Sequence, residues 1–398
     1  MISCRWSTIK VSNSEQQYNK KVLNILSIGH LTSDTYGGFI LPIMPLIALK
    51  LNISLGLVGI LLAISSLSSS ILQPLFGYIS DLINRRVFII GGIILSSIFI
   101  SLTGLAGNIW IFGILLFLGS MGVGLFHPQA TAYAGHYSGK QINKYMGVFT
   151  AFGTLGYALG PFLSSVLVES FGLQSTIFAV IPGLIVLYLL YTMVPRISTR
   201  VNQPKKKIDF KKLHSLKGIL VVLAFIAVIR ALIVVSFDVY MPFVWMEHNI
   251  SVIFIGTLIG LFSFLGGIAS YIGGRLSDTL GRKSIMVISM LPAIPCLLGA
   301  LFLLDSFSIL SFVLFVTAGF LIMSSTSVNL VIGQTAMPES AGLVSGIIGG
   351  FSWGIAGLLL PLIGFLATKY GIITVLAVIS FLPILGAIST AYISKEYA

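Results

Sequence analysis

The chain has 398 residues, of which 56% are hydrophobic and 9% are charged, and its mean hydropathy is +1.04. A soluble domain needs a polar surface that this composition does not supply, so we predict a membrane protein. The net charge is +12, but the basic residues fall in the connections between apolar runs. This placement argues against a nucleic-acid partner and favours contact with lipid headgroups of the bilayer.

The apolar runs can be followed along the whole chain. Residues 1–21 are polar and lack an apolar stretch with a cleavage site, so we expect a tail there and no signal peptide. Twelve runs follow, each long enough to cross about 30 Å of hydrocarbon as a helix of roughly 20 residues. A polar connection occupies 195–217, and a second tail occupies 394–398. The runs are centred in 22–49, 54–79, 87–105, 109–135, 143–168, 173–194, 218–245, 252–275, 284–304, 308–335, 341–367 and 371–393.

Positive charge is distributed unevenly between the two sides of the membrane. If successive runs alternate in direction, 20 of the 23 Lys and Arg residues lie on one side. The positive-inside bias then predicts a multi-pass protein of the cell membrane with both termini in the cytoplasm. Cys4 lies in the tail and Cys296 within a run, so we expect neither a disulfide nor a metal site from them. We also expect no cofactor and a monomeric protein.

Two similar charged turns stand half a chain apart. GYISDLINRR, residues 77–86, lies between runs two and three, and GRLSDTLGRK, residues 274–283, lies between runs eight and nine. The offset of 197 residues is close to half of 398, which indicates a duplicated six-helix unit. We therefore predict an all-α membrane protein with twelve transmembrane helices in two six-helix halves, 22–194 and 218–393.

Each charged turn is predicted to act as a gate. Its glycine lets two helices approach closely, and its aspartate can pair with basic residues, so the turn can latch two helices and release them. We expect Asn84 to take the left-handed backbone conformation that suits its counterpart Gly281. The predicted gating residues are Gly77, Asp81, Arg85, Arg86, Gly274, Asp278, Arg282 and Lys283.

The two turns resemble the signature loop of the major facilitator superfamily, and twelve runs with a basic central connection agree with its fold over the whole chain. Within that superfamily, four stretches resemble the fosmidomycin-resistance group of exporters. They are GHLTSDTYGGFILPIMPLI (29–47), ILQPLFGYISD (71–81), GVGLFHPQATAYAG (122–135) and GQTAMPESAGLVSGIIGGFSWGIAGLLLPLIG (333–364). Members of that group are similar to proton-coupled drug efflux proteins, so the resemblance implies export of a small molecule, such as fosmidomycin, against proton entry.

Ionisable residues inside apolar runs are costly and are therefore candidates for function. His30 and Asp34 lie one helical turn apart on one face of the first run, about 12 to 18 Å along it at 1.5 Å per residue. A carboxylate beside an imidazole can exchange a proton when its hydration changes, so we predict that this pair couples transport to protons. The alternative is a static polar pair that fixes the first helix. Two ligands alone do not predict a metal site.

Arg230 lies near mid-depth in the seventh run and cannot readily lose its proton. It needs an anionic partner, which could be Asp34, Asp238, or a phosphonate or carboxylate of the substrate. A buried internal ion pair is the alternative. His127 precedes Pro128, which removes a backbone hydrogen bond, so His127 either contacts substrate or stabilises a kink. The predicted substrate-binding residues are Arg230, Asp238, His127, Asn329 and Gln334, of which the last two could equally make interhelical hydrogen bonds.

The fifth run contains FGTLGYALGPF, in which Gly153, Gly156 and Gly160 precede Pro161. Small residues at this spacing allow close helix contact, and the proline bends the helix. The stretch resembles the Gly-Pro motif of drug antiporters. Serines at 164–165 replace the second glycine pair expected after the proline, which weakens the inference of antiport.

Three other functions are open at this point. The first is a proton-coupled importer of a sugar or organic acid. The second is an intramembrane enzyme that uses His30, Asp34 and His127, but the chain has no HExxH, GxSxG or phosphate-binding loop. The third is a structural or receptor protein, which would not need duplicated gating turns. Since no nucleotide-binding motif is present, we expect a non-enzymatic transporter driven by an ion gradient.

Overall fold

The computed structural model describes residues 18–195, 216–337 and 340–394, and every named element in these ranges is helical. Twelve segments are long and apolar enough to cross a membrane, which confirms the predicted fold class. Most of the two predicted tails and of the predicted linker lies outside the described residues. So does the side chain of Asp81.

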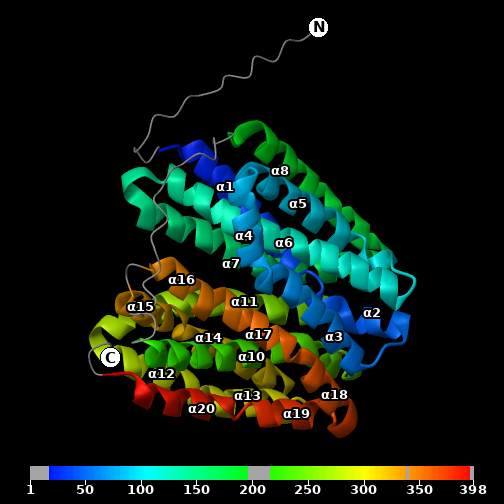
Figure 1. Cartoon of the computed structure of the whole chain (residues 1–398). Coiled ribbons are helices and arrows are strands. Elements are labelled where there is room, and N and C mark those ends of the chain that lie inside the picture. Colours follow the sequence, from blue (N-terminus) through cyan, green and yellow to red (C-terminus); the bar gives the residue numbers. More distant parts are fainter. Residues whose placement is uncertain (1–17, 196–215, 338–339, 395–398) are drawn as a thin grey trace.

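The first six spans form one bundle, drawn from blue to green in Figure 1. Three of these spans are broken into shorter elements where a proline or a π turn interrupts the α-helix. The elements are α1 (Lys20–Gly38), η1 (Leu41–Ile43), α2 (Met44–Leu51), α3 (Leu55–Ser66), η2 (Leu67–Ile71), α4 (Gln73–Leu82), α5 (Arg85–Ser101), η3 (Thr103–Leu105), α6 (Ile109–Tyr137), η4 (Gly139–Gln141), α7 (Ile142–Phe171), η5 (Leu173–Ala179) and α8 (Val180–Met193).

The last six spans form a second bundle beside the first, drawn from green to red in Figure 1. Its elements are α10 (Lys217–Glu247), α11 (Val252–Leu280), α12 (Arg282–Met290), α13 (Ala293–Phe302), α14 (Ser308–Ser324), α15 (Thr326–Ala336), α16 (Ala341–Ser345), η7 (Gly346–Phe351), α17 (Ser352–Leu358), α18 (Leu360–Tyr370), α19 (Ile372–Ile379), α20 (Leu382–Ser389) and η8 (Thr390–Tyr392). Both ends of the chain lie on one side of the molecule, which we call the termini side; the opposite side is the far side.

Polar caps fix where several spans begin. The side chains of Asn19, Asn108 and Ser251 accept hydrogen bonds from the backbone N–H groups three residues later. These caps satisfy N–H groups that have no partner within the helix. They let an apolar span begin abruptly after a short connection.

The two repeated turns differ in backbone conformation, and the expectation for Asn84 was wrong. Gly281 has φ 85°, in the left-handed region, whereas Asn84 has φ −168° and is extended. The reason is that the Asn84 side chain accepts a hydrogen bond from the Arg86 N–H at 2.9 Å. An asparagine that caps a helix with its side chain takes an extended backbone, and glycine cannot cap in this way.

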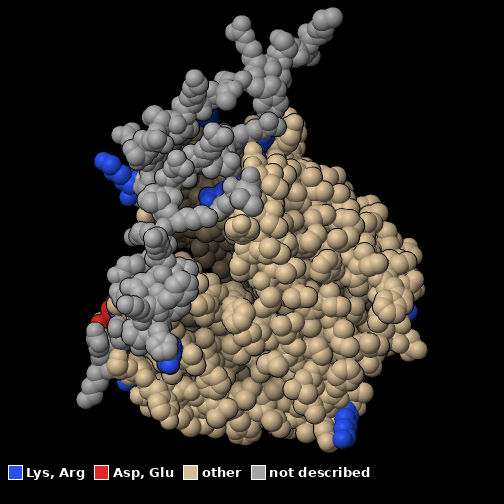
Figure 2. All heavy atoms as spheres, in the orientation of Figure 1, with Lys and Arg blue, Asp and Glu red and all other residues tan. Residues whose placement is uncertain are grey.

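The two halves touch on the far side and separate on the termini side. On the far side α3 packs on α18 and α7 packs on α11. Gly59 faces the Leu360 carbonyl, and Gly260 faces that of Ala158, so the backbones approach closely. On the termini side, no atom lies within 4 Å of where a Cβ would stand on Gly77 or Gly147. Figure 2 shows the hollow between the halves on this side.

Candidate transport site

His30 and Asp34 meet His127 at the middle of the first bundle. His30 and Asp34 lie on α1, about 20 Å from its start for Asp34 at 1.5 Å per residue. His127 reaches them from α6. Its Nε2 atom is 2.8 Å from Oδ1 of Asp34, and Nε2 of His30 is 3.3 Å from Oδ2. We call these three residues the triad. Its side chains are 10% to 25% exposed, so solvent reaches a charged cluster at mid-depth.

The second nitrogen of each imidazole fixes the protons of the triad. Nδ1 of His30 is 2.8 Å from the Phe149 carbonyl, and Nδ1 of His127 is 2.8 Å from the Val123 carbonyl. A carbonyl oxygen only accepts, so each Nδ1 donates and each Nε2 faces Asp34. A proton must therefore lie in the 2.8 Å contact between His127 and Asp34, either on nitrogen or on oxygen. The triad can hold, give up and regain protons.

Glycines of α7 make room for the triad. A Cβ on Gly153 would collide with the His30 ring and with Oδ2 of Asp34. One and two turns farther along, Gly156 faces the Leu31 carbonyl and Gly160 faces the Thr35 carbonyl. The three glycines thus seat α7 directly on α1. Pro161 lies inside α7, which runs without interruption from Ile142 to Phe171.

The triad also has the spacing of a possible metal site, because its three ligand atoms lie within 4.8 Å of one another. The sequence offered two of these ligands, and His127 is the third. Zinc ligands bound at about 2.0 Å in a tetrahedron are about 3.3 Å apart. The 2.8 Å contact between His127 and Asp34 is shorter than this spacing and has the length of a charge-assisted hydrogen bond. The spacing favours a shared proton.

Arg230 lies at the same depth in the second bundle, on α10. The residue is 3% exposed, and its guanidinium donates to the Ser325 hydroxyl at 3.0 Å. Ser289 donates to the same hydroxyl at 2.8 Å. Within the described part of the chain no carboxylate pairs with Arg230, and its Nε atom has no hydrogen-bond partner. Arg230 lines a cavity of 80 Å³ together with Ser345 and Trp353. A buried cation without a counter-ion suits an anionic ligand.

The other predicted substrate residues lie apart from this cavity. Asn329 is fully buried and donates to the Leu223 carbonyl at 3.0 Å, which ties α15 to α10. Gln334 donates to Ser345 at 2.8 Å. Asp238 is 1% exposed, and both of its carboxyl oxygens lack a partner among the described residues.

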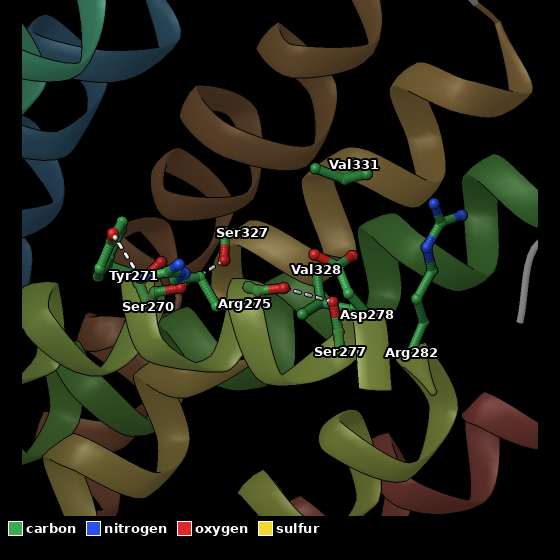
Figure 3. A pocket seen from close by; sticks show the side chains of 10 residues that line it. Ser270, Tyr271, Arg275, Ser277, Asp278, Arg282, Ser327, Val328 and Val331 are labelled. Carbon is green, nitrogen blue, oxygen red and sulfur yellow. Dashed lines mark hydrogen bonds between the residues drawn. The ribbon is translucent and has the colours of Figure 1, made fainter. Parts of the chain in front are cut away.

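The repeated turns lie at the termini side in two different environments. Arg86 is buried; its guanidinium donates to the Tyr191 carbonyl and lies 5.4 Å from the centre of that ring. In the second turn, Asp278 and Arg282 line a cavity of 330 Å³ between α11 and α15. Figure 3 shows Tyr271 and Arg275 side by side on α11, with Ser327 of α15 across the cavity from them. The structure places Gly274 in the same lining.

Sequence reasoning assigned His127 to the substrate and missed its contact with Asp34. The only signal was that both are ionisable residues in apolar spans, and residue spacing does not reveal which helices pack together. The sequence also gave no sign that Ser325 is the hydrogen-bond partner of Arg230.

Comparison with known proteins agrees with the fold and the site. The model of the Major Facilitator Superfamily matches residues 26–361. The chain is 28% identical over 384 residues to the fosmidomycin resistance protein of Escherichia coli (strain K12), covering 92% of this chain and 91% of that protein. A bacterial homologue of the human lysosomal transporter Spinster, in an inward-facing and occupied conformation, superposes with a TM-score of 0.80 at 14% identity, covering 96% and 98% of the two chains.

A D-xylose-proton symporter superposes with a TM-score of 0.77 at 17% identity, covering 95% of this chain and 98% of that one. These two structures share the twelve-helix arrangement, and the family model covers most of the sequence. The chain belongs to the major facilitator superfamily of membrane transporters.

Proposed function

We propose that this protein exports a small anionic molecule across the cell membrane in exchange for protons. The observation that carries the proposal is the placement of a protonatable triad in one half and an arginine without a carboxylate partner in the other, at equal depth. A proton and an anion can then bind at the same level of the membrane without sharing a site.

The two ligands act on different helices. Addition of a proton to Asp34 weakens its attraction to the imidazolium of His127, and so loosens the tie between α1 and α6. An anion at Arg230 supplies the missing counter-charge and ties α10 to the elements that line its cavity. Each ligand therefore changes the packing within one half, which lets occupancy bias the arrangement of the two halves.

The substrate class follows from Arg230 and from one relative. A planar guanidinium binds phosphonate or carboxylate groups with two parallel hydrogen bonds. The Escherichia coli relative is named for resistance to fosmidomycin. We propose an exported phosphonate or carboxylate, with fosmidomycin as the first candidate.

The orientation and the gates complete the proposal. The excess of Lys and Arg on the termini side places that side in the cytoplasm, so the cavity is open to the cell interior. When the cavity closes, the repeated turns latch it. In the second turn Asp278 is the acidic partner, and the exposed Lys144 of α7 is the base that can reach it across the gap. The protein works as a monomer.

The test is substrate-triggered proton movement in proteoliposomes that hold a trapped pH dye and a metal chelator. Fosmidomycin leads a panel of phosphonates, organic acids, sugars and lipophilic cations. We expect protons to move opposite to an anionic substrate, and Asp34→Asn to abolish this movement while substrate exchange continues. Movement in the same direction would replace the exporter with an importer. No movement with any compound would contradict the proposal.

A further inference from the structure

Asp238 is a buried carboxyl group that the proposed exchange of a proton at the triad and an anion at Arg230 does not use. It lies on α10, eight residues beyond Arg230, which is about 12 Å nearer the far side at 1.5 Å per residue. The residue is 1% exposed, and neither carboxyl oxygen has a hydrogen-bond partner among the described residues. Such a carboxyl group is unusual, because buried polar side chains are almost always paired.

No basic side chain compensates Asp238. Arg230 donates to Ser325, and Lys50, the charged residue of the neighbouring α2, donates to the Gly104 carbonyl at 2.9 Å. The titratable neighbour is Tyr157 of α7, which lies near enough to interact electrostatically with both Asp238 and Asp34. A bare carboxylate in this place would carry an uncompensated charge in an apolar surrounding, whereas the neutral acid does not.

The surroundings of Asp238 come from both halves of the protein. The adjacent Phe237 and Val239 belong to an apolar cluster that also contains Phe39 and Ile43 of the first span. The elements η1 and α2 contact α10 here. The closed far side is therefore what keeps water from Asp238. If the halves separate on that side, α10 loses this cover and the carboxyl group becomes hydrated.

We propose that Asp238 carries a proton in this conformation and is a second proton-binding site, which exchanges its proton with the far side when the halves part there. The inference rests on the proposed proton-coupled exchange. Tyr157 stands between the two sites: its ring lies beside Gly37, one turn from Asp34, and it interacts with both carboxyl groups. Its hydroxyl group can pass a proton between the triad and Asp238.

The first experiment is infrared difference spectroscopy on the purified full-length protein. We expect the carbonyl stretch of a protonated carboxylic acid that persists at neutral pH, where exposed carboxyls are ionised. The band disappears in Asp238→Asn, shifts in Asp238→Glu, and remains in Asp34→Asn. The glutamate variant keeps the test valid if the asparagine variant does not fold. A wild-type spectrum without this band, or a band that neither Asp238 variant changes, overturns the proposal.

The second experiment measures how many protons move per substrate in proteoliposomes. We expect the ratio to be lower in Asp238→Asn than in the wild type, and Tyr157→Phe to slow proton movement without removing the infrared band. An unchanged ratio in Asp238→Asn would show a buried neutral acid with no part in transport. The spectroscopic result needs no transport, so failure of Asp34→Asn to affect coupling would contradict the proposed function and leave the protonation of Asp238 measurable.

Discussion

Asp34 is contacted through both of its carboxyl oxygens, and the two imidazoles come from different helices. One imidazole is held by α7 through the Phe149 carbonyl, and the other by its own helix through the Val123 carbonyl. The acceptor for His127 is one residue before Gly124, whose carbonyl loses its helical partner because Pro128 has no N–H. The position of each ring is therefore set by backbone atoms, and only the shared protons are free to move.

At this scale we predict that His127→Asn lowers transport driven by a pH gradient about tenfold or more. A hydrogen bond to a charged group contributes roughly 1.5 to 3 kcal/mol, and each 1.4 kcal/mol corresponds to a factor of about ten. His136→Asn is the matched control, because His136 lies on the same helix and packs its ring on Tyr137. Initial rates in proteoliposomes check the prediction, and equal rates for the two variants would remove His127 from the coupling site.

We also predict that Arg230→Lys raises the KM for an anionic substrate by about ten- to a hundredfold and leaves that for a neutral one unchanged. The ammonium keeps the charge but loses the planar pair of donors, which is worth about 1.5 to 3 kcal/mol when the acceptor is charged. Competition binding with phosphonates and uncharged analogues measures the two effects. Equal loss for both classes would mean that Arg230 only supports the fold.

Much of the site could be predicted from single residues, and part of it could not. His30 and Asp34 were found because four-residue spacing puts two side chains on one helix face. Arg230 was found because a charge in an apolar span needs a partner. The contact between His127 and Asp34 depends on how α6 packs on α1, and no local pattern encodes it.

At the scale of elements, α7 is seated on α1 by glycines, and the tightest contact is between Gly156 and the Leu31 carbonyl. We predict that Gly156→Ala destabilises the protein by about 1 to 3 kcal/mol, because backbone must move to admit the methyl group. Gly147→Ala on the same helix is the control: its Cβ would meet nothing, and alanine favours a helix by up to about 1 kcal/mol. Thermal unfolding in detergent compares them, and equal melting temperatures would contradict the packing.

The twelve spans were predictable because hydropathy and length decide what can cross a bilayer. The turn conformations were not, as Asn84 shows. Its side chain can either cap the next helix or tolerate a left-handed backbone, and both choices fit the sequence equally well. The hydrogen bond to the Arg86 N–H decided between them.

At the scale of the whole molecule, the closed far side and the open termini side predict where the halves meet when they rock. Gly267 of α11 already contacts Thr154 of α7. Because the two helices run antiparallel, one turn toward the termini side brings Thr150 opposite Tyr271. In a background without Cys4 and Cys296, we predict that Thr150→Cys with Tyr271→Cys cross-links slowly at rest and faster during transport.

The matched control for this cross-link lies at the other end of the same helices. The Glu169 carboxylate accepts a hydrogen bond from the Ile253 N–H at 2.7 Å on the far side. Glu169→Cys with Ile253→Cys should cross-link at rest and more slowly during transport. Electrophoresis of the two pairs measures both rates, and parallel changes would contradict a rocking motion. The duplicated turns predicted two halves, but the same repeat is present in either arrangement, so the sequence could not say which side is open.

The separate placement of the triad and Arg230 has an electrical consequence. If a monoanion leaves the cell while one proton enters, two positive charges move inward in each cycle, and neither ligand neutralises the other on the way. Each charge is driven by about 2.3 kcal/mol per 100 mV of membrane potential. Export would then be driven by an inside-negative voltage even without a pH difference, and a second proton carried at Asp238 would steepen that voltage dependence by one more charge.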